Sequence, residues 1–239
     1  MKHVTPALRP LALVTGAGSL LGHDLALHLA GRGCDLLLAD ADGESLLALR
    51  EELAGRASQV QLFQGNMARA EQRRELLHFL RLAGVKPDIF CFQAAAHLRE
   101  RRLSATSAEV RAQVEAGLLA LDDLLRGGLL ADMLREGNGY VLVALRRESL
   151  AVRAGAAVSS ALGAGLARYL EALRQELVGS GVSITCCLVG AEGAQLLPSD
   201  RSMPAAGAGS QALAARALKA LFTRRFWVNA PLWARCRLS

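Results

Sequence analysis

Short apolar runs alternate along the chain with longer segments in which leucine and alanine recur at helical spacing. The apolar runs, each bounded by polar or turn-forming residues, predict seven β-strands: Leu11–Thr15, Asp35–Ala39, Gln59–Gln64, Ile89–Gln93, Tyr140–Leu145, Ser183–Val189 and Phe226–Val228. The longer segments predict helices near residues 20–31, 43–55, 70–83, 107–135, 157–178 and 210–222. Strict alternation of strand and helix predicts an α/β fold: a doubly wound, mostly parallel, seven-stranded sheet with helices on both faces.

The length of 239 residues is typical of one α/β domain, and the chain shows neither an internal repeat nor a linker. We therefore expect residues 1–239 to form a single domain. Apolar runs are too short, or too often interrupted by charge and glycine, to predict a membrane span, and the N-terminus does not resemble a secretory leader. The loosest segment, Gly190–Ser210, is expected to form a loop over the carboxyl edge of the sheet.

The chain carries a net charge of +6, which raises the question of a nucleic-acid partner. Its basic residues are dispersed, however, and only 4% of its residues are the aromatic ones that stack on bases, so a solvated surface is favoured. The five cysteines form no CxxC pair and no metal-ligand set. We expect reduced thiols, no metal site and a cytoplasmic protein without nucleic-acid or membrane partners.

A glycine-rich turn follows the first predicted strand and leads into the first predicted helix. Such a turn lets backbone N–H groups and the positive end of a helix hold a pyrophosphate, as in a Rossmann-like dinucleotide site. Asp40, 18 residues after Gly22, would bind an adenosine ribose and repel a 2′-phosphate, favouring NAD over NADP. The alternative is a tight structural turn beside a surface aspartate. The candidate cradle residues are Gly16, Gly18, Ser19, Leu20, Leu21, Gly22 and Asp40.

Motifs spread over nearly the whole chain resemble those of the short-chain dehydrogenase/reductase family, in its single-domain type. Thr15 to Gly22 resembles the family's TGxxxGxG turn, with Leu20 at the central glycine. Asn66-Met67 resembles the Asp-hydrophobic pair beside the adenine, and Gly190 matches the glycine of the family's PG pair. The family's NNAG positions read Phe92, Gln93, Ala94 and Ala95. The resemblance implies NAD as the cofactor, with binding weakened or lost where Leu20 and Ala95 replace glycines.

The family's chemistry, as the resemblance implies it, uses a Tyr and a Lys in a YxxxK motif, a Ser about thirteen residues before the Tyr, and an Asn on the preceding helix. The segment SSALGAGL resembles the family's YSASKAAL and places Ser159 in the Tyr slot and Gly163 in the Lys slot. Arg146 then occupies the Ser slot, and Glu115 lies near the Asn slot. No tyrosine anywhere in the chain is followed four residues later by lysine.

The leading hypothesis is a catalytically degenerate family member that acts as a dinucleotide-binding, regulatory or partner subunit. We expect a homo-oligomer, dimer or tetramer, or a hetero-oligomer with an active relative, assembled through the segments 107–135 and 157–178. The alternative is an NAD(P)-dependent oxidoreductase, or a non-redox enzyme, with altered catalytic residues.

Replacement catalytic groups have ordinary interpretations as well as functional ones. His97 follows the fourth predicted strand and could donate a proton, or it could simply cap the strand end. The loop from Arg146 to Ser149 could bind an anionic ligand, or its Arg–Glu pair could be solvated. His23 and His28 of the first predicted helix are as consistent with surface positions as with a site, and Glu192 and Asp200 lie in the loose segment without an identified partner.

Overall fold

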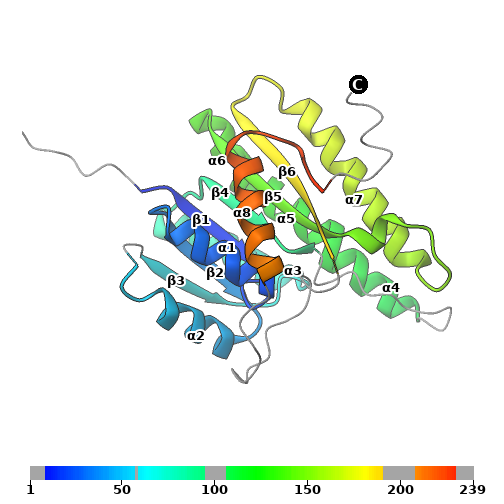
Figure 1. Ribbon diagram of the computed structural model, residues 1–239, viewed down its shortest axis with the longest axis horizontal. Coiled ribbons are helices and arrows are strands. Elements are labelled where there is room, and N and C mark those ends of the chain that lie inside the picture. The colour runs from blue at the N-terminus through cyan, green and yellow to red at the C-terminus, as the bar shows by residue number, and fades with distance from the viewer. Residues whose placement is uncertain (1–8, 57–58, 95–105, 191–207, 230–239) are drawn as a thin grey trace, which may run out of the picture.

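One sheet contains all seven strands of the computed structural model, which describes residues 9–56, 59–94, 106–190 and 208–229 (Figure 1). Its order is β3-β2-β1-β4-β5-β6-β7, and every neighbouring pair is parallel. The predicted fold class is confirmed. The strands are β1 (Leu11–Thr15), β2 (Asp35–Asp40), β3 (Val60–Gln64), β4 (Ile89–Phe92), β5 (Gly139–Arg146), β6 (Val182–Val189) and β7 (Trp227–Val228).

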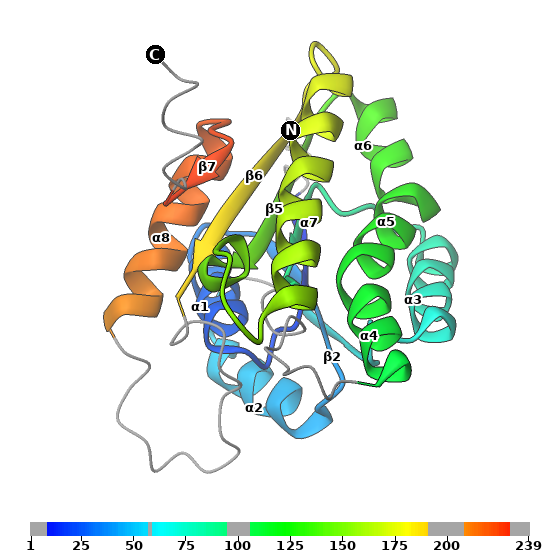
Figure 2. The same ribbon diagram turned by 90° about the vertical axis from the view of Figure 1, so that its right-hand side faces the viewer.

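Helices cover both faces of the sheet (Figure 2). One face packs against α1, α2 and α8, and the other against α3, α5, α6 and α7. None of the helices in the described ranges combines the length and the apolar character needed to cross a bilayer. The helices are α1 (Leu20–Ala30), α2 (Gly43–Leu53), α3 (Ala70–Ala83), α4 (Ser107–Val114), α5 (Ala120–Leu124), α6 (Leu130–Glu136), α7 (Ala157–Glu176) and α8 (Ala208–Phe222).

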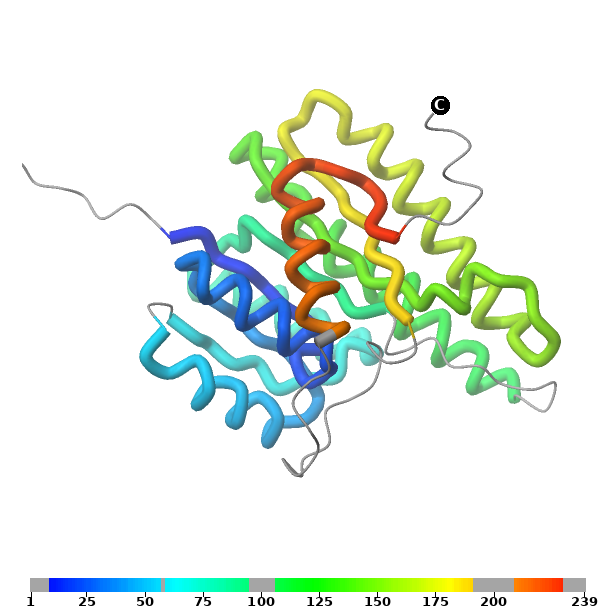
Figure 3. Tube along the Cα trace, in the orientation of Figure 1, coloured from blue at the N-terminus to red at the C-terminus, as the bar shows by residue number. Residues whose placement is uncertain are grey.

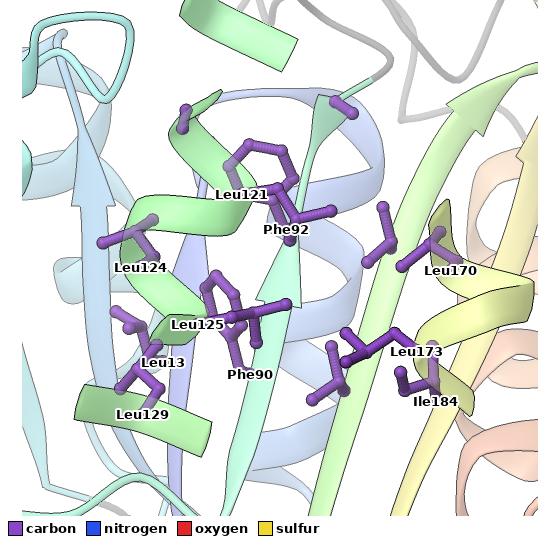
Figure 4. Close-up of a cluster of buried hydrophobic side chains, with 14 of the residues drawn as sticks. Leu13, Phe90, Phe92, Leu121, Leu124, Leu125, Leu129, Leu170, Leu173 and Ile184 are labelled. Atoms are coloured by element: carbon purple, nitrogen blue, oxygen red, sulfur yellow. The ribbon is translucent and has the colours of Figure 1, made fainter. Parts of the chain in front are cut away.

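The central strands are apolar on both faces because each face is covered by helices, whereas the edge strand β3 carries exposed glutamines. Along β1, Leu13 belongs to the core under α3, α5 and α7, whereas Val14 belongs to the core under α1 and α8. Figure 4 shows Phe90 and Phe92 of β4 packed beside leucines of the α5 region, including Leu121 and Leu125. All four of these side chains are almost completely buried. Burial of each contributes about 1.5–3 kcal/mol, so this layer holds the sheet and helices in register.

The predicted helix over residues 107–135 is confirmed in extent, but it is not one regular α-helix. The segment contains α4, a π-helical turn at Glu115–Leu119, α5, a second π-helical turn at Leu125–Leu129, and α6 (the tube in Figure 3 follows this path). The second turn contains Gly128, whose φ of 154° lies in a region that residues with a β-carbon rarely adopt. Neighbouring Gly127 lies so close to Leu77 of α3 that a β-carbon would collide with it. Two adjacent glycines thus let the helix bend against α3, although the apolar periodicity continues through them.

A buried arginine joins α3 to the helices beside it. The Arg73 side chain is 1% exposed, and its Nε and Nη2 donate to Asp123 Oδ2 at 2.9 and 2.6 Å. Its Nη2 also donates to Glu115 Oε2 at 3.0 Å, and its Nη1 donates to the backbone oxygen of Met67 at 2.8 Å. The guanidinium therefore links α3, the first π-helical turn, α5 and the chain after β3.

We expect Arg73→Met to destabilise the fold by roughly 2–4 kcal/mol, because it removes several hydrogen bonds from a buried site. The loss of stability is smaller than for breaking a fully buried ion pair, because Asp123 and Glu115 are 48% and 43% exposed and can be hydrated in the variant. The matched control is Arg74→Met, because Arg74 is the exposed neighbour on the same helix. Urea denaturation of both variants measures the difference; equal effects would contradict the role given to Arg73.

Candidate functional site

The strand order reverses direction between β1 and β4, which lie side by side at the centre of the sheet. Thr15, the last residue of β1, donates from Oγ1 to the backbone oxygen of Cys91 in β4 at 3.3 Å. Doubly wound sheets bind their ligands at the carboxyl ends of the two strands where the order reverses, and this place beside β1 and β4 is called the crevice below. The glycine-rich turn, Asp40, Asn66, Gln93 and Arg146 lie at or just after the carboxyl ends of strands at this edge.

The glycine-rich turn between β1 and α1 is tightly closed. Gly16 has φ of 67°, which favours glycine. A β-carbon on Gly22 would lie 3.0 Å from the Cα of Ala17, against backbone that cannot give way. Ser19 caps α1, since its Oγ accepts from the N–H of Gly22 at 3.1 Å and donates to the backbone oxygen of Gly16 at 2.7 Å. These contacts hold the start of α1 at the crevice.

Several hydrogen-bond donors at this turn have no partner among the described residues. They include the backbone N–H groups of Leu20 and Leu21, which open α1. The side-chain Nε2 of Gln93 is also buried without a partner, and this side chain lies directly against Gly16. Helix-start N–H groups together with an amide donor suit an anionic ligand such as a pyrophosphate. Leu20, half-buried, is the one side chain of the turn that stands where a glycine would let backbone approach more closely.

Asp40 closes the cradle from the end of β2. Its Oδ2 accepts from the N–H of Gly18 at 2.9 Å, and its Oδ1 accepts from the N–H of Asp42 at 3.0 Å. Asp42 caps α2, and its hydrogen bond from Ser45 lowers the pKa of the Asp42 carboxyl. With Glu44 in the first turn of α2, three carboxylates gather at this end of the cradle and disfavour further negative charge.

The remaining predicted cradle residues lie along the same edge. Asn66 follows β3 and uses its Oδ1 to accept from the N–H of Ala68 at 2.9 Å. Met67 is buried, and its backbone is held by Arg73. Ala94 is buried at the end of β4, and Ala95 lies outside the described residues.

The predicted Tyr and Lys slots are both filled by small residues on α7. Ser159 is buried and donates to the backbone oxygen of Ala156 at 3.1 Å. At Gly163, a β-carbon would lie 2.6 Å from both the Cβ and the backbone oxygen of Ser149. Ser149 belongs to η4, a single 3₁₀ turn over Arg147–Leu150. This turn therefore occupies the space into which a side chain at position 163 would extend.

The predicted Ser and Asn slots carry charged side chains. Arg146 ends β5 with its side chain 24% exposed, and its Nε lies 3.9 Å from Oε2 of Glu148, which is 28% exposed. Both side chains are thus partly buried and still reach solvent, so neither interpretation of this loop is excluded. Glu115 is turned toward α3, where it pairs with Arg73.

The described tyrosines and lysines all lie away from the crevice. Tyr140 begins β5 at the opposite edge, where its ring contacts Phe222. Tyr169 is ten residues beyond Ser159, about 15 Å further along α7. Burial and a 2.6 Å hydrogen bond to Asp122 raise the pKa of Tyr169 to about 12. Lys86 and Lys219 precede β4 and β7, so they too belong to the amino edge of the sheet.

The histidine and carboxylate candidates do not assemble into a site among the described residues. His97, Glu192 and Asp200 lie outside those residues. His23 of α1 contacts Glu52 of α2, with Nε2 2.8 Å from Oε2. Burial alone would lower the pKa of His23, but the carboxylates of Asp24 and Glu52 outweigh it and raise that pKa. His23 therefore joins two helices, and His28 is half-buried on α1.

A family model of the short chain dehydrogenases matches residues 10–204. The chain belongs to the short-chain dehydrogenase family. This family binds a nicotinamide dinucleotide, its members commonly form oligomers, and the matched residues include the cradle and the α7 positions.

The similarity extends to named relatives and solved structures. The chain is 28% identical over 179 residues to an uncharacterized oxidoreductase of Myxococcus xanthus, covering 75% of this chain and 70% of that protein. It is 26% identical over 197 residues to the (2S)-[(R)-hydroxy(phenyl)methyl]succinyl-CoA dehydrogenase subunit BbsC of Thauera aromatica, covering 82% of this chain and 78% of that one. The bulky-bulky ketone specific alcohol dehydrogenase from Comamonas testosteroni shares the fold, with a TM-score of 0.78 at 20% identity over 92% of this chain and 85% of that one.

Sequence reasoning missed the contact between Ser149 and Gly163. A glycine inside a helix costs about 1 kcal/mol relative to alanine, so its presence in α7 was a signal of close packing. Nothing in the sequence indicated which segment would approach it, because the two residues lie on different elements.

We expect Gly163→Ala to destabilise the protein by roughly 1–3 kcal/mol, since the added methyl group meets Ser149 in a filled space. The control is Gly165→Ala on the same helix, where a β-carbon meets nothing within 4 Å and should stabilise by about 0.5–1 kcal/mol. Urea denaturation reports both free energies of unfolding. Stabilisation by both substitutions would contradict the packing described at position 163.

Proposed function

We propose that this short-chain dehydrogenase binds a dinucleotide but does not carry out the family's proton-coupled hydride transfer, and that it acts as a regulatory or partner subunit in the cytoplasm. The observation that carries the proposal is the close contact between Ser149 and Gly163. A turn of the protein itself takes the space in which the family's lysine would extend.

The proposed loss of hydride-transfer activity follows from the lack of a positioned group that could transfer the proton. Removing a positioned general acid lowers a rate by about 10²–10⁴. A serine at position 159 is shorter and less acidic than a phenol, and its hydroxyl is already donated to Ala156. At position 163 there is no ammonium to lower the pKa of a neighbouring acid, and the described tyrosines lie elsewhere. The site therefore supports binding better than reduction.

The cradle supports NAD as the preferred dinucleotide. The N–H groups of Leu20 and Leu21 and the amide of Gln93 would hold its phosphates and neighbouring groups. Asp40 would accept from the adenosine ribose, and the carboxylates of Asp42 and Glu44 would repel a 2′-phosphate. When bound, NAD supplies a hydride acceptor; this chain's own contribution is to bind and orient it.

A partner-subunit role is supported by the name of one relative. The Thauera aromatica protein is named as a subunit of a dehydrogenase, so a chain of this kind is part of a larger enzyme there. We propose that this chain likewise assembles as a homo-oligomer, or as a hetero-oligomer with an active family member.

The proposal predicts binding of dinucleotide without turnover. Titration of the full chain with NADH, followed by fluorescence, should show saturation, and NADH at 100 times its dissociation constant should raise stability by about 2.7 kcal/mol. Leu20→Gly should tighten binding, since it restores the family's central glycine. A panel of ketones and alcohols should give no NAD-dependent turnover.

Two results would overturn the proposal. If neither the natural chain nor Leu20→Gly binds NADH, the proposed dinucleotide binding is contradicted. Turnover on the panel would instead favour the alternative, an oxidoreductase or non-redox enzyme with altered catalytic residues, which the naming of the Myxococcus xanthus relative as an oxidoreductase supports.

We expect Asp40→Asn to shift the NADH:NADPH affinity ratio toward NADPH by about tenfold, because the amide keeps an acceptor for Gly18 but removes a negative charge. Glu51→Gln, an exposed carboxylate toward the end of α2, is the control and should leave the ratio unchanged. Competition between NADH and NADPH, followed by fluorescence, measures the ratio. An unchanged ratio in Asp40→Asn would contradict the role given to that carboxylate.

A further inference from the structure

The side chain of Arg146 is partly buried, and its guanidinium makes no hydrogen bond to any described residue. All of its N–H groups are donors, and a donor removed from water without a partner loses free energy. The side chain is 24% exposed, so water reaches only part of it. The guanidinium nitrogens are not among the fully buried polar atoms, so a group that makes no hydrogen bond to the described residues can still take up a ligand from solution.

Glu148 orients this cation without satisfying it. Its Oε2 is buried, has no hydrogen-bond partner within the described part of the chain, and lies 3.9 Å from Nε of Arg146, beyond hydrogen-bond distance. Because the carboxylate faces Nε, the two terminal Nη groups remain for another partner. Arg147, the exposed neighbour, adds a second positive charge, so cations outnumber carboxylates in this turn.

The base of the side chain is held rigidly. Ser149 donates from Oγ to the backbone oxygen of Arg146 at 2.7 Å, and the same serine packs against Gly163 of α7. The end of β5 is also paired with β6, with Arg146 opposite Val189. A fixed backbone reduces the entropy lost when the guanidinium binds a ligand.

The position of Arg146 places it beside the crevice. Side chains alternate along β5, so Arg146 shares the face of Leu142 and Ala144, which is the face covered by α1, α2 and α8, with α8 nearest to β5. It stands at the carboxyl end of its strand, at the same edge as the glycine-rich turn that opens α1.

We propose that Arg146, positioned by Glu148, binds the oxyanion of a small ligand, a carboxylate or a phosphate, through its two Nη groups. The pair of parallel donors matches two oxygens of one planar or tetrahedral oxyanion. This inference rests on the proposed function, in which the crevice binds ligands rather than reducing them, and it names the class of ligand. At the position where the family has a serine, whose neutral hydroxyl contacts the substrate, Arg146 would instead bind a ligand through its positive charge.

The test measures binding of inorganic phosphate, acetate and benzoate to the full chain by isothermal titration calorimetry, at constant ionic strength and without dinucleotide. We expect at least one probe to bind, Arg146→Gln to weaken it by about tenfold or more, and Arg147→Gln to change it by less than about twofold. Circular dichroism checks that each variant is folded. Arg146→Lys, which keeps the charge but loses the paired donors, should recover only part of the affinity.

Glu148→Gln tests the positioning role. It should weaken binding of the same probe while leaving the fold intact. It should also shift the NMR signal of the Arg146 Nε–H group, which is assigned by its disappearance in Arg146→Lys. Comparison of the phosphate titration with the acetate and benzoate titrations shows whether the ligand carries a phosphate or a carboxylate. Competition by NADH that is insensitive to Arg146→Gln would place the anion at the start of α1 and overturn the inference.

Other results also overturn it: no probe binding at millimolar concentration, or equal losses in Arg146→Gln and Arg147→Gln. These outcomes are separable from the fate of the proposed function. If no anion binds, the proposed function still holds as long as the chain binds NADH without turnover. If the natural chain shows turnover, the proposed function fails, but the anion-binding isotherm is unaffected.

Discussion

The turn that follows β5 packs directly against α7 because position 163 carries no side chain. Ser149 comes so close to Gly163 that a β-carbon there would lie 2.6 Å from its backbone oxygen. That contact sets the path of the chain from Arg146 to Leu150, and with it the place where the Arg146 guanidinium emerges. A larger residue at position 163 would move the turn, and the arrangement of charge at the end of β5 would change with it.

The two halves of the crevice depend on different chemistry. The half formed by β1 and α1 works through backbone N–H groups and a tight glycine turn, so it tolerates changes in most side chains. The half formed by β5 and α7 would need particular side chains for proton transfer, and those positions carry Arg146, Ser159 and Gly163. A family member can therefore keep a nucleotide cradle after its catalytic half has diverged, which is the basis of the proposed function.

Prediction from sequence worked where structure depends on local pattern. The strands were recognised because a doubly covered parallel sheet requires apolar runs, and their ends agree with the structure to within about a residue. The glycine-rich turn was recognised because its conformation needs glycines at fixed positions. The breaks inside residues 107–135 were missed, since Gly127 and Gly128 permit a bend but do not require one. The bend lies where Gly127 packs against Leu77, which is fifty residues earlier in the chain.

By itself the sequence determined the order of strands and helices, the cradle's position and the lack of a Tyr–Lys pair at the family's spacing, because each is a property of neighbouring residues. Tertiary structure alone decided that Ser149 fills the space beside Gly163, that Arg73 is buried among three elements, and that Arg146 makes no hydrogen bond to the residues the structure describes. Those outcomes depend on distances between segments far apart in the chain. Burial and hydrogen bonding of a charged side chain are decided only when such segments have packed together.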